Sequence, residues 1–304
     1  MIPAFPEFKK IGVDDREAVE SHTHRYPPYS DFTFTSLWAW DTSNERMVSE
    51  LNGNLVVRFT DYKTDEPFLS FLGSNKPSET ALSLLEYCAA NGLPSHLKLM
   101  PEISVKGIDP QRFQIEEDRD NFDYITSVYR LHTYSGAELS AKRRQHALFS
   151  RRNKNFIFRQ LDLSDQKTME DVRNLFSIWL VNKNEHLPAE QEHEFIALQR
   201  CLSVQSPSLI ATGIFIEESL TAFWILEDIG NGYTISHFEK ADLNQHIGIS
   251  PYLKQKTAEI LHKRELVYVN LEQDLGIPGL RKNKESYYPQ HFLKKFAVIP
   301  IDRL

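Results

Sequence analysis

Residues 209–240, LIATGIFIEESLTAFWILEDIGNGYTISHFEK, contain three strand-like segments in close succession. Apolar and β-branched residues dominate Leu209–Ile216, Leu220–Glu227 and Tyr233–Lys240, as expected of strands with buried faces. The connections between them are short, and the second is Gly230-Asn231-Gly232, a sequence typical of a tight hairpin turn. This stretch therefore predicts a meander of three antiparallel strands.

The segments on either side of the meander extend it into an α/β lobe. Before it come a predicted strand, a helix starting at Ser164 or Asp165, and a second helix: 155–163, 164–182 and 192–202. After it come a helix ending near Lys263, with Ser250 as N-cap and Pro251 in the first turn, and the strand Glu265–Leu271. The order is strand, helix, helix, three antiparallel strands, helix, strand.

The first half of the chain repeats a weaker version of this order. The strands and the helix expected there are 47–51, 55–60, 68–72, 78–90 (the helix), 96–100 and 124–130. We therefore predict an α/β (α+β) protein of two lobes, residues 1–135 and 136–304, each a mixed sheet flanked by helices. The duplication rests on the order of elements, because no repeat is visible in the sequence itself.

Composition agrees with a folded protein in a reducing compartment. Of the 304 residues, 41% are hydrophobic, which is enough for two cores. The two cysteines, Cys88 and Cys201, have neither disulfide-framework nor metal-site spacing. The sequence shows no signal peptide at its start and no run of about 18 apolar residues. These features predict a cytoplasmic protein without a membrane span.

Charge is distributed unevenly on a chain of net charge −7. No acidic residue occurs from Leu139 to Leu161, and the cations there are Lys142, Arg143, Arg144, Arg151, Arg152, Lys154 and Arg159. Such a segment creates a local positive field that attracts phosphate groups. The alternative is a solvated helix face that is balanced by acidic residues elsewhere.

The loop before the predicted helix ending at Lys263 is a candidate anion site. It has the pattern Gln245-x-x-Gly248-x-Ser250. Glycine permits close approach of the backbone, and free N–H groups at a helix start point at an anion. A coenzyme A pyrophosphate or a tRNA phosphate is the expected ligand, and a plain helix cap is the alternative.

Polar residues at the end of the last predicted strand form a second candidate site. Side chains alternate along a strand, so Asn270, Glu272 and Asp274 are expected on one face. Arg281 and Lys284 follow shortly and could pair with them. The alternatives are a structural ion-pair network and a carboxylate that takes a proton from an attacking amine or hydroxyl.

His237 and Glu239 are expected to share one face of the third meander strand, and either could act as a general base. The alternative for His237 is a hydrogen-bonded histidine within a sheet. The sequence contains no GxSxG, HExxH, GxxxxGK[ST] or strand-linked GxGxxG motif. The common serine hydrolase, zincin, P-loop and Rossmann classes are therefore disfavoured.

A longer pattern near the end of the chain resembles a known family. It reads Glu272-Gln273-Asp274-Leu275-Gly276-x-x-Gly279-Leu280-Arg281-x-x-Lys284-x-Ser286-Tyr287-x-Pro289. With the segments 237–242, 142–144 and 32–40, it is similar to the phosphatidylglycerol lysyltransferase C-terminal-domain family. The resemblance spans nearly the whole chain. It implies two tandem lobes of the GNAT (N-acyltransferase) fold.

The resemblance also implies an activity and a set of roles. Characterised relatives move an amino acid from aminoacyl-tRNA to a membrane lipid, with no protein-bound intermediate and no required cofactor. By motif position, Glu272 and Asp274 would orient the aminoacyl ammonium or serve as base. Arg281 and Lys284 would hold phosphate or a developing oxyanion. Lys142 and Arg143 would contact the tRNA end, and Tyr287 would line the site.

Three functions remain open from the sequence. The first is an aminoacyltransferase that uses aminoacyl-tRNA as donor and a hydroxyl or amine on a small molecule, peptide or lipid as acceptor. The second is an N-acyltransferase with a coenzyme A thioester as donor, with Gln245, Gly248 and Ser250 binding the cofactor. The third is a catalytically inert GNAT-like binding protein. No metal site is expected for any of them.

Overall fold

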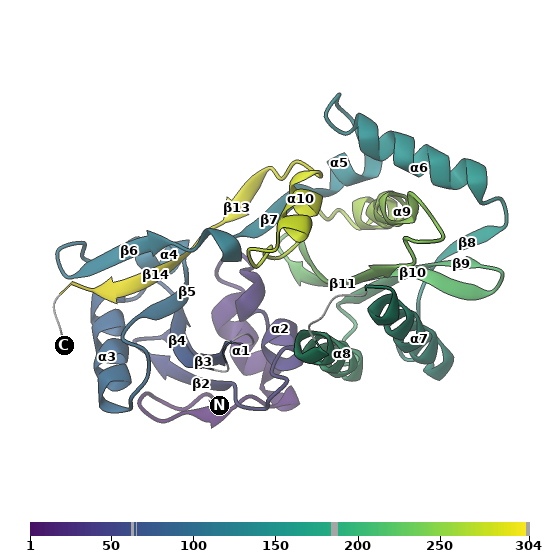
Figure 1. The fold of residues 1–304 in the computed structure, drawn as a ribbon. Coiled ribbons are helices and arrows are strands. Elements are labelled where there is room, and N and C mark those ends of the chain that lie inside the picture. Colours follow the sequence, from purple (N-terminus) through teal and green to yellow (C-terminus); the bar gives the residue numbers. More distant parts are fainter. Residues whose placement is uncertain (62–63, 65, 184–187, 302–304) are drawn as a thin grey trace. The chain divides into compact units, whose positions relative to one another are not determined.

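The computed structural model describes residues 1–61, 64, 66–183 and 188–301 (Figure 1). The chain forms two compact units that are interleaved along the sequence. Unit 1 contains Met1–Asp123, Gln273–Gly276 and Phe292–Leu304, and unit 2 contains Tyr124–Glu272 and Ile277–His291. The expected lobes 1–135 and 136–304 were inferred from the order of the elements along the chain, and they stay a prediction. The two units are instead defined by which residues pack together in space.

Unit 1 contains two antiparallel sheets. The first has the order β1-β2-β3-β4 and the second the order β5-β14-β6. Their strands are β1 (Lys9–Lys10), β2 (Met47–Leu51), β3 (Asn54–Thr60), β4 (Pro67–Leu72), β5 (Leu97–Pro101), β6 (Phe113–Glu117) and β14 (Lys295–Pro300). In Figure 1 the yellow strand β14, from the end of the chain, lies between the blue strands β5 and β6.

The helices of unit 1 are α1 (Arg16–Thr23), α2 (Phe34–Ala39), α3 (Pro77–Ala90) and the short α4 (Glu102–Val105). Helix α3 buries Leu84, Leu85 and Cys88 against both sheets, in a core shared with Phe71 and Val298. It ends at Ala90 with Asn91 as its C-cap, and Gly92 follows with φ +66°, a left-handed conformation suited to glycine. The predicted helix stop at this position is confirmed.

Unit 2 is built on a mixed sheet with the order β13-β7-β12-β11-β10-β9-β8. Its strands are β7 (Asp123–Ser127), β8 (Phe156–Gln160), β9 (Leu209–Ile216), β10 (Ser219–Gly230), β11 (Tyr233–Ala241), β12 (Tyr268–Asn270) and β13 (His291–Leu293). The chain passes from one unit to the other within β7 and again within β13. Strands β8 to β11 pair antiparallel in sequence order, and β12 pairs parallel to β11. The predicted three-stranded meander is confirmed almost residue for residue.

Helices cover both faces of this sheet (Figure 1). They are α5 (Val128–Thr133), α6 (Ser140–Arg152), α7 (Gln166–Lys183), α8 (Pro188–Ser203), α9 (Ile249–Lys263) and α10 (Pro278–Glu285). Helix α9 packs on one face, where Thr257 hydrogen-bonds Thr212 of β9 at 2.7 Å. Helix α7 packs on the other face, where the Lys240 ammonium lies 3.9 Å from the Trp179 ring centroid.

Three predicted strands are shorter in the structure, and the one expected at 155–163 is reduced to β8 (Phe156–Gln160). The strand expected over Glu265–Leu271 is reduced to β12, because Glu265 and Glu272 both have φ of +60° and interrupt the extended backbone. The strand expected at 124–130 ends at Ser127, where the chain turns into α5. The Ser127 hydroxyl accepts a hydrogen bond from Arg130 N and caps that helix.

Candidate functional site

Two lysines and one tyrosine form the centre of a charged cluster on the α9 side of unit 2. The Lys142 ammonium, from α6, lies 3.9 Å from the Tyr287 ring centroid. The Lys254 ammonium, from α9, lies 5.3 Å from the same centroid and 4.3 Å from that of Trp224. These distances are within the range of cation–π attraction.

Glu239 supplies the negative charge of this cluster. Its carboxylate contacts the Lys254 ammonium and accepts a hydrogen bond from the Ser250 hydroxyl. Lys254 is only 3% exposed, so this ion pair is shielded from solvent. The predicted site residues Lys142, Glu239, Ser250 and Tyr287 are therefore brought together, from four separate elements of the sequence.

Buried hydroxyls extend the cluster inward. Tyr287 hydrogen-bonds both Ser250 and Tyr134, and the Tyr134 hydroxyl donates to Pro251 O at 2.7 Å. Burial raises the pKa of both tyrosines well above the usual value, and the nearby Glu239 charge adds to this effect. Both phenols therefore stay neutral and serve as hydrogen-bonding groups.

Lys142 has an unusual protonation equilibrium. Partial burial, followed by the positive charge of Lys254, lowers its pKa to about 8, against a weaker opposing effect of Glu239. The group is still mainly an ammonium at pH 7. Its charge is the part of the cluster that an incoming anion can reach, because Lys142 is half-buried whereas Lys254 is buried.

A second group of titratable side chains surrounds His237. The imidazole Nε2 lies 3.0 Å from Glu227 Oε2, and Nδ1 lies 3.8 Å from Glu272 Oε1. Glu227 is buried, whereas the Glu272 side chain is 19% exposed. A buried imidazole between two carboxylates can pass a proton, and Glu272 is the member with access to solvent.

His237 and Glu239 point to different sides of the sheet, so the prediction that they share a face is wrong. In the β10–β11 register, Ile225 pairs with Phe238 and Leu226 with Ser236, which makes His237 the extra residue of a β-bulge. Glu239 faces α9 together with its partner Trp224. His237 instead bonds Glu227, on the opposite face of β10 from Trp224.

The chain beyond β12 also departs from simple alternation. Asn270 is buried, and its side-chain oxygen accepts a hydrogen bond from Glu272 N at 2.7 Å, which stabilises a turn. The buried Lys284 ammonium donates to Leu271 O and braces the same turn from α10. Asn270 and Lys284 therefore shape the backbone that presents Glu272.

Asp274 belongs to unit 1, so the predicted common face of Asn270, Glu272 and Asp274 is not formed. The Asp274 carboxylate is fully buried, lies 3.2 Å from Arg119 Nη1 and accepts a hydrogen bond from Gly276 N at 2.9 Å. The positive φ of Glu272 turns the backbone and breaks the alternation. In unit 1, Asp274 is part of an ion-pair arrangement, which matches the structural alternative.

The predicted anion loop is packed tightly against protein. Helix α9 starts at Ile249, so Gly248 with φ +88° is the N-cap, and the prediction of Ser250 in that position is wrong. A Cβ at Gly248 would lie 2.1 Å from the Gln145 main-chain oxygen of α6. The glycine therefore permits contact between two helices, and the Ser250 hydroxyl is directed to Glu239. Gln245 is exposed in the same loop.

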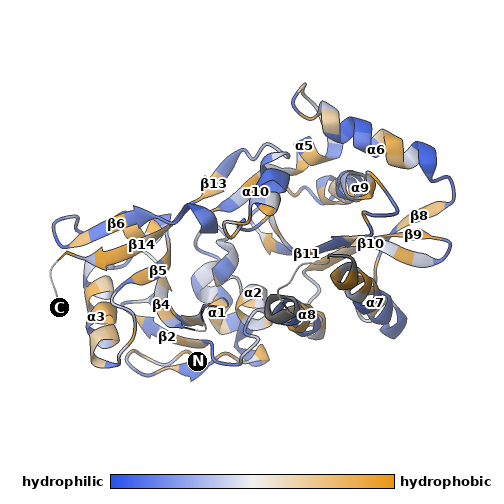
Figure 2. Cartoon of the chain, viewed as in Figure 1, coloured by the Kyte–Doolittle hydropathy of each residue, from blue (hydrophilic) through white to orange (hydrophobic). Residues whose placement is uncertain are grey.

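Arg143 and Arg281 occupy the remaining predicted positions. Arg143 donates to Tyr134 O and, at 2.7 Å, to Gly136 O, so it holds the end of α5. Arg281 is half-buried in α10. Figure 2 shows that α6, which carries Arg143, is largely hydrophilic along its length.

Sequence reasoning missed Lys254, Glu227 and Tyr134. A signal for Lys254 exists, because it adjoins Leu253 on the stripe of α9 residues that faces the sheet. A signal for Glu227 also exists. It follows the apolar residues of a predicted strand, and the alternation of side chains along that strand places it on a buried face. Tyr134 gives no sequence signal, since its role depends on a left-handed turn at the end of α5.

The mixed sheet with helices on both faces, carrying these two clusters, defines a GNAT-like α/β protein, as the sequence predicts. The chain belongs to the family described as phosphatidylglycerol lysyltransferase, C-terminal, which matches residues 23–299. A comparison with curated proteins finds no match.

Solved structures show the same fold over nearly the whole chain. A conserved protein of unknown function from Bacteroides thetaiotaomicron has a TM-score of 0.82 and 23% identity, covering 98% of this chain and 99% of that one. The C-terminal domain of a protein assigned as a lysylphosphatidylglycerol synthetase in Agrobacterium fabrum has a TM-score of 0.66 and 12% identity, covering 94% and 91%. The L-PGS from Bacillus licheniformis has a TM-score of 0.58 and 13% identity, covering 100% and 95%.

No helix within the described ranges is long and apolar enough to cross a membrane. Within the same part of the chain, no group of three or more His, Cys, Asp or Glu side chains is placed to hold a metal ion.

Proposed function

We propose that the protein is an aminoacyltransferase that moves an aminoacyl group from aminoacyl-tRNA to an amine or hydroxyl acceptor by direct transfer. One observation carries the proposal. The C-terminal family motif places Glu272 beside His237 and Tyr287 beside Lys142 and Ser250, so motif residues meet the two titratable clusters of unit 2. The name of the family supports an aminoacyl group as the transferred unit.

The chemistry requires a proton acceptor and a group that stabilises negative charge. The acceptor nitrogen or oxygen attacks the ester carbonyl of the donor, and a bond to the carbonyl carbon forms. Glu272 takes the proton that the nucleophile loses, and His237, oriented by Glu227, stabilises the carboxylate. The ester bond then breaks, and the proton passes to the ribose oxygen that leaves.

The lysine cluster would bind anionic groups of the substrates. Lys142 and Lys254 together carry two positive charges against the single charge of Glu239. This excess favours a phosphate of the tRNA end. No cofactor takes part in this scheme. The packing of Gly248 against α6 leaves less room for a coenzyme A pyrophosphate, which favours tRNA over coenzyme A as the donor.

The test is transfer of a radiolabelled amino acid from charged tRNA. The purified chain is incubated with tRNAs charged with individual amino acids and with bilayers containing phosphatidylglycerol, amino-bearing peptides or small amines. We expect one pairing to yield a labelled product. Glu272→Gln and Lys142→Met should each reduce the rate roughly 100-fold, the scale of a lost base or charge-stabilising group.

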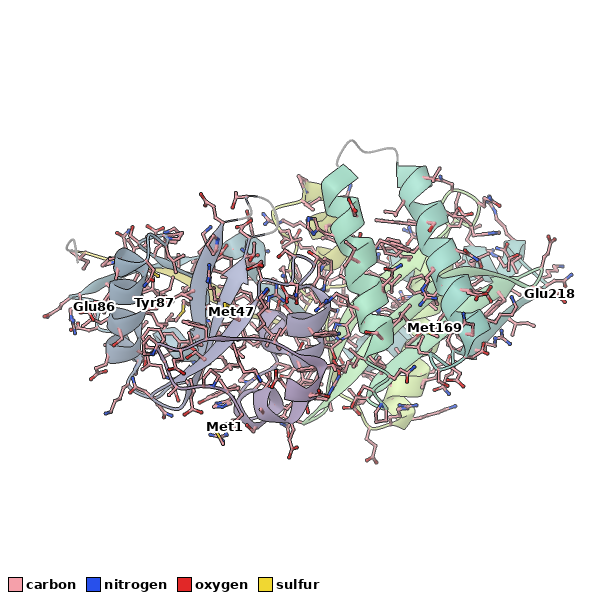
Figure 3. All side chains as sticks on the ribbon, turned by 90° about the horizontal axis from the view of Figure 1, so that it is seen from below. Met1, Met47, Glu86, Tyr87, Met169 and Glu218 are labelled. Carbon is pink, nitrogen blue, oxygen red and sulfur yellow. The ribbon has the colours of Figure 1, made fainter. Side chains whose placement is uncertain are left out.

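Two controls separate chemistry from folding. Glu218→Gln changes an exposed carboxylate at the β9–β10 turn (Figure 3), and Lys256→Met changes another lysine of α9; both should transfer at the normal rate. Thermal unfolding checks that all four variants are folded. If acetyl-coenzyme A, and no charged tRNA, acts as donor, the aminoacyltransferase proposal is wrong and an acyl-coenzyme A transferase replaces it. If no donor reacts, the binding-protein alternative holds.

A further inference from the structure

Lys142 and Lys254 differ in how firmly each is held. Lys254 is buried, and its ammonium is fixed by the Glu239 carboxylate and by the Trp224 ring. Lys142 is half-buried, and within the described residues it forms no ion pair. Its ammonium rests on the Tyr287 face, beside the Lys254 ammonium. The arrangement therefore opposes protonation of Lys142.

This arrangement has a direct effect on the amine. With the pKa of Lys142 lowered to about 8, roughly a quarter of the side chain is a free amine at pH 7.5, against about one part in a thousand for an ordinary lysine. A lysine that is partly desolvated and placed next to another cation is a nucleophile at neutral pH. The side chain nevertheless keeps a route to solvent.

We propose that Lys142 is a site of N-acylation by activated acyl donors, acyl phosphates and acyl thioesters. The lone pair of the Lys142 amine attacks the donor carbonyl, and an amide C–N bond forms. The C–O or C–S bond to the phosphate or thiolate breaks, and the leaving group carries away the electron pair. The amine proton passes to water or to the leaving group, and no oxidant or reductant is involved.

Acylation would change the charge of the cluster. The amide is neutral, so the positive charge that contacts Tyr287 from α6 is lost, and only Lys254 remains to balance Glu239. The two then neutralise each other and the attraction for an anion disappears. Under the proposed function, on which this consequence rests, acylated protein should transfer as slowly as Lys142→Met. The modification itself does not depend on that function.

The experiment measures acylation of each lysine in the full chain. The protein is incubated with acetyl phosphate, and occupancy is followed with time by peptide mass spectrometry. Lys167, whose side chain is 80% exposed, is the internal reference. At pH 7.5 we expect Lys142 to react about tenfold faster than Lys167. The expected ratio of the two acylation rates is smaller than the ratio of the free-amine fractions, because an amine with a lower pKa is also a weaker nucleophile.

The pH profile distinguishes the mechanism from simple accessibility. The Lys142 rate should rise to a plateau with a midpoint near pH 8, whereas reaction limited by an ordinary lysine amine would still be rising at about pH 9.5. Lys254→Met removes the neighbouring charge and raises the pKa of Lys142, so acylation of Lys142 at pH 7.5 should fall several-fold. Lys254→Arg keeps the charge, and Lys256→Met changes a lysine of the same helix; neither should lower the rate.

Two results would overturn the proposal. One is a Lys142 rate no higher than that of Lys167 at pH 7.5 in the unmodified chain, a measurement that requires no variant to fold. The other is a Lys142 profile that is still rising at pH 9.5. Because the readout is a mass shift at one lysine, it stays informative even if aminoacyl transfer is not found.

Discussion

Lys295 is a buried cation of unit 1, with 0% side-chain exposure. Its ammonium lies 2.8 Å from Asp123 and 3.2 Å from the Ser30 hydroxyl, and it also contacts Asp31. Burial alone would lower its pKa, but the two carboxylates raise it above the usual value, so the charge persists at neutral pH. Gln273, from the family motif, hydrogen-bonds both Ser30 and Asp31. One part of the family motif, at Gln273, therefore stabilises unit 1, whereas Glu272 belongs to the candidate site of unit 2.

Lys295→Met should destabilise unit 1 strongly. The substitution leaves the buried Asp123 and the partly buried Asp31 without their cation, and breaking one side of a buried ion pair costs about 3–5 kcal/mol. Urea unfolding followed by circular dichroism measures the loss. The matched control is Lys294→Met, since Lys294 is 40% exposed and pairs with the exposed Glu117, a contact worth less than about 1 kcal/mol. Equal losses for the two variants would contradict this account.

Among the elements, the pairing of α6 with α9 depends on one glycine. Gly248 has a left-handed φ of +88°, and its Cα faces the Gln145 backbone at a distance that excludes any side chain. The aromatic residues His146 and Tyr252 stack nearby, with ring centroids 4.6 Å apart, and continue the contact between the two helices. Lys142 of α6 and Lys254 of α9 are held in the same cluster by this packing.

Gly248→Ala should therefore lower the free energy of unfolding by more than the strain of a left-handed backbone at alanine alone. Strain accounts for about 1–2 kcal/mol and the backbone clash for about 1–3 more. Gly230→Ala is the matched control, because Gly230 has φ +83° but nothing within 4 Å of the added Cβ, so only the strain is expected. Thermal unfolding of both variants makes the comparison. A loss at Gly248 no larger than at Gly230 would mean that α6 moves aside freely.

The elements show which parts of the fold were predictable from sequence. The meander 209–241 and the helix α3 were predictable because alternation, short turns and a Gly-containing helix stop are local signals. The bulge at His237 and the left-handed Glu272 are not encoded by such patterns, since both residue types normally favour regular backbone. Each of them changed which side chains share a face, and so each altered the predicted site.

The pairing of strands that lie far apart in the sequence was the other feature that the sequence did not predict. Strand β14 joins β5 and β6 in unit 1, and β7 joins β12 in unit 2, although neither pairing follows sequence order. The candidate site was partly predictable, because local charge, strand position and loop pattern indicate Lys142, Glu239 and Ser250, the family motif indicates Tyr287, and the four do meet. Their partner Lys254 was not predicted: the sequence indicates its inward position on α9, but not the carboxylate on another strand that it meets there.

For the whole molecule, the central strand of the β5-β14-β6 sheet comes from residues 295–300. Deleting residues 295–304 should therefore leave β5 and β6 without the strand that joins them, and remove Lys295 as well. We expect hydrogen exchange to show loss of protection throughout unit 1, including α3. The control deletes only residues 302–304, which keeps β14 intact. Unchanged protection in the larger deletion would show that β14 is dispensable.

Because the two units are interleaved along the sequence, unit 1 can be completed only after the last residues of the chain have been synthesised. Residues 1–123 emerge first, yet their second sheet lacks its middle strand, and Asp123 lacks its cation, until residues 295–300 have been made. Translation at about 5–20 residues per second separates these events by roughly 10 to 35 seconds. During that interval strands β5 and β6 have unpaired edges, which can pair with other chains. The unit that is translated first is thus the one that matures last.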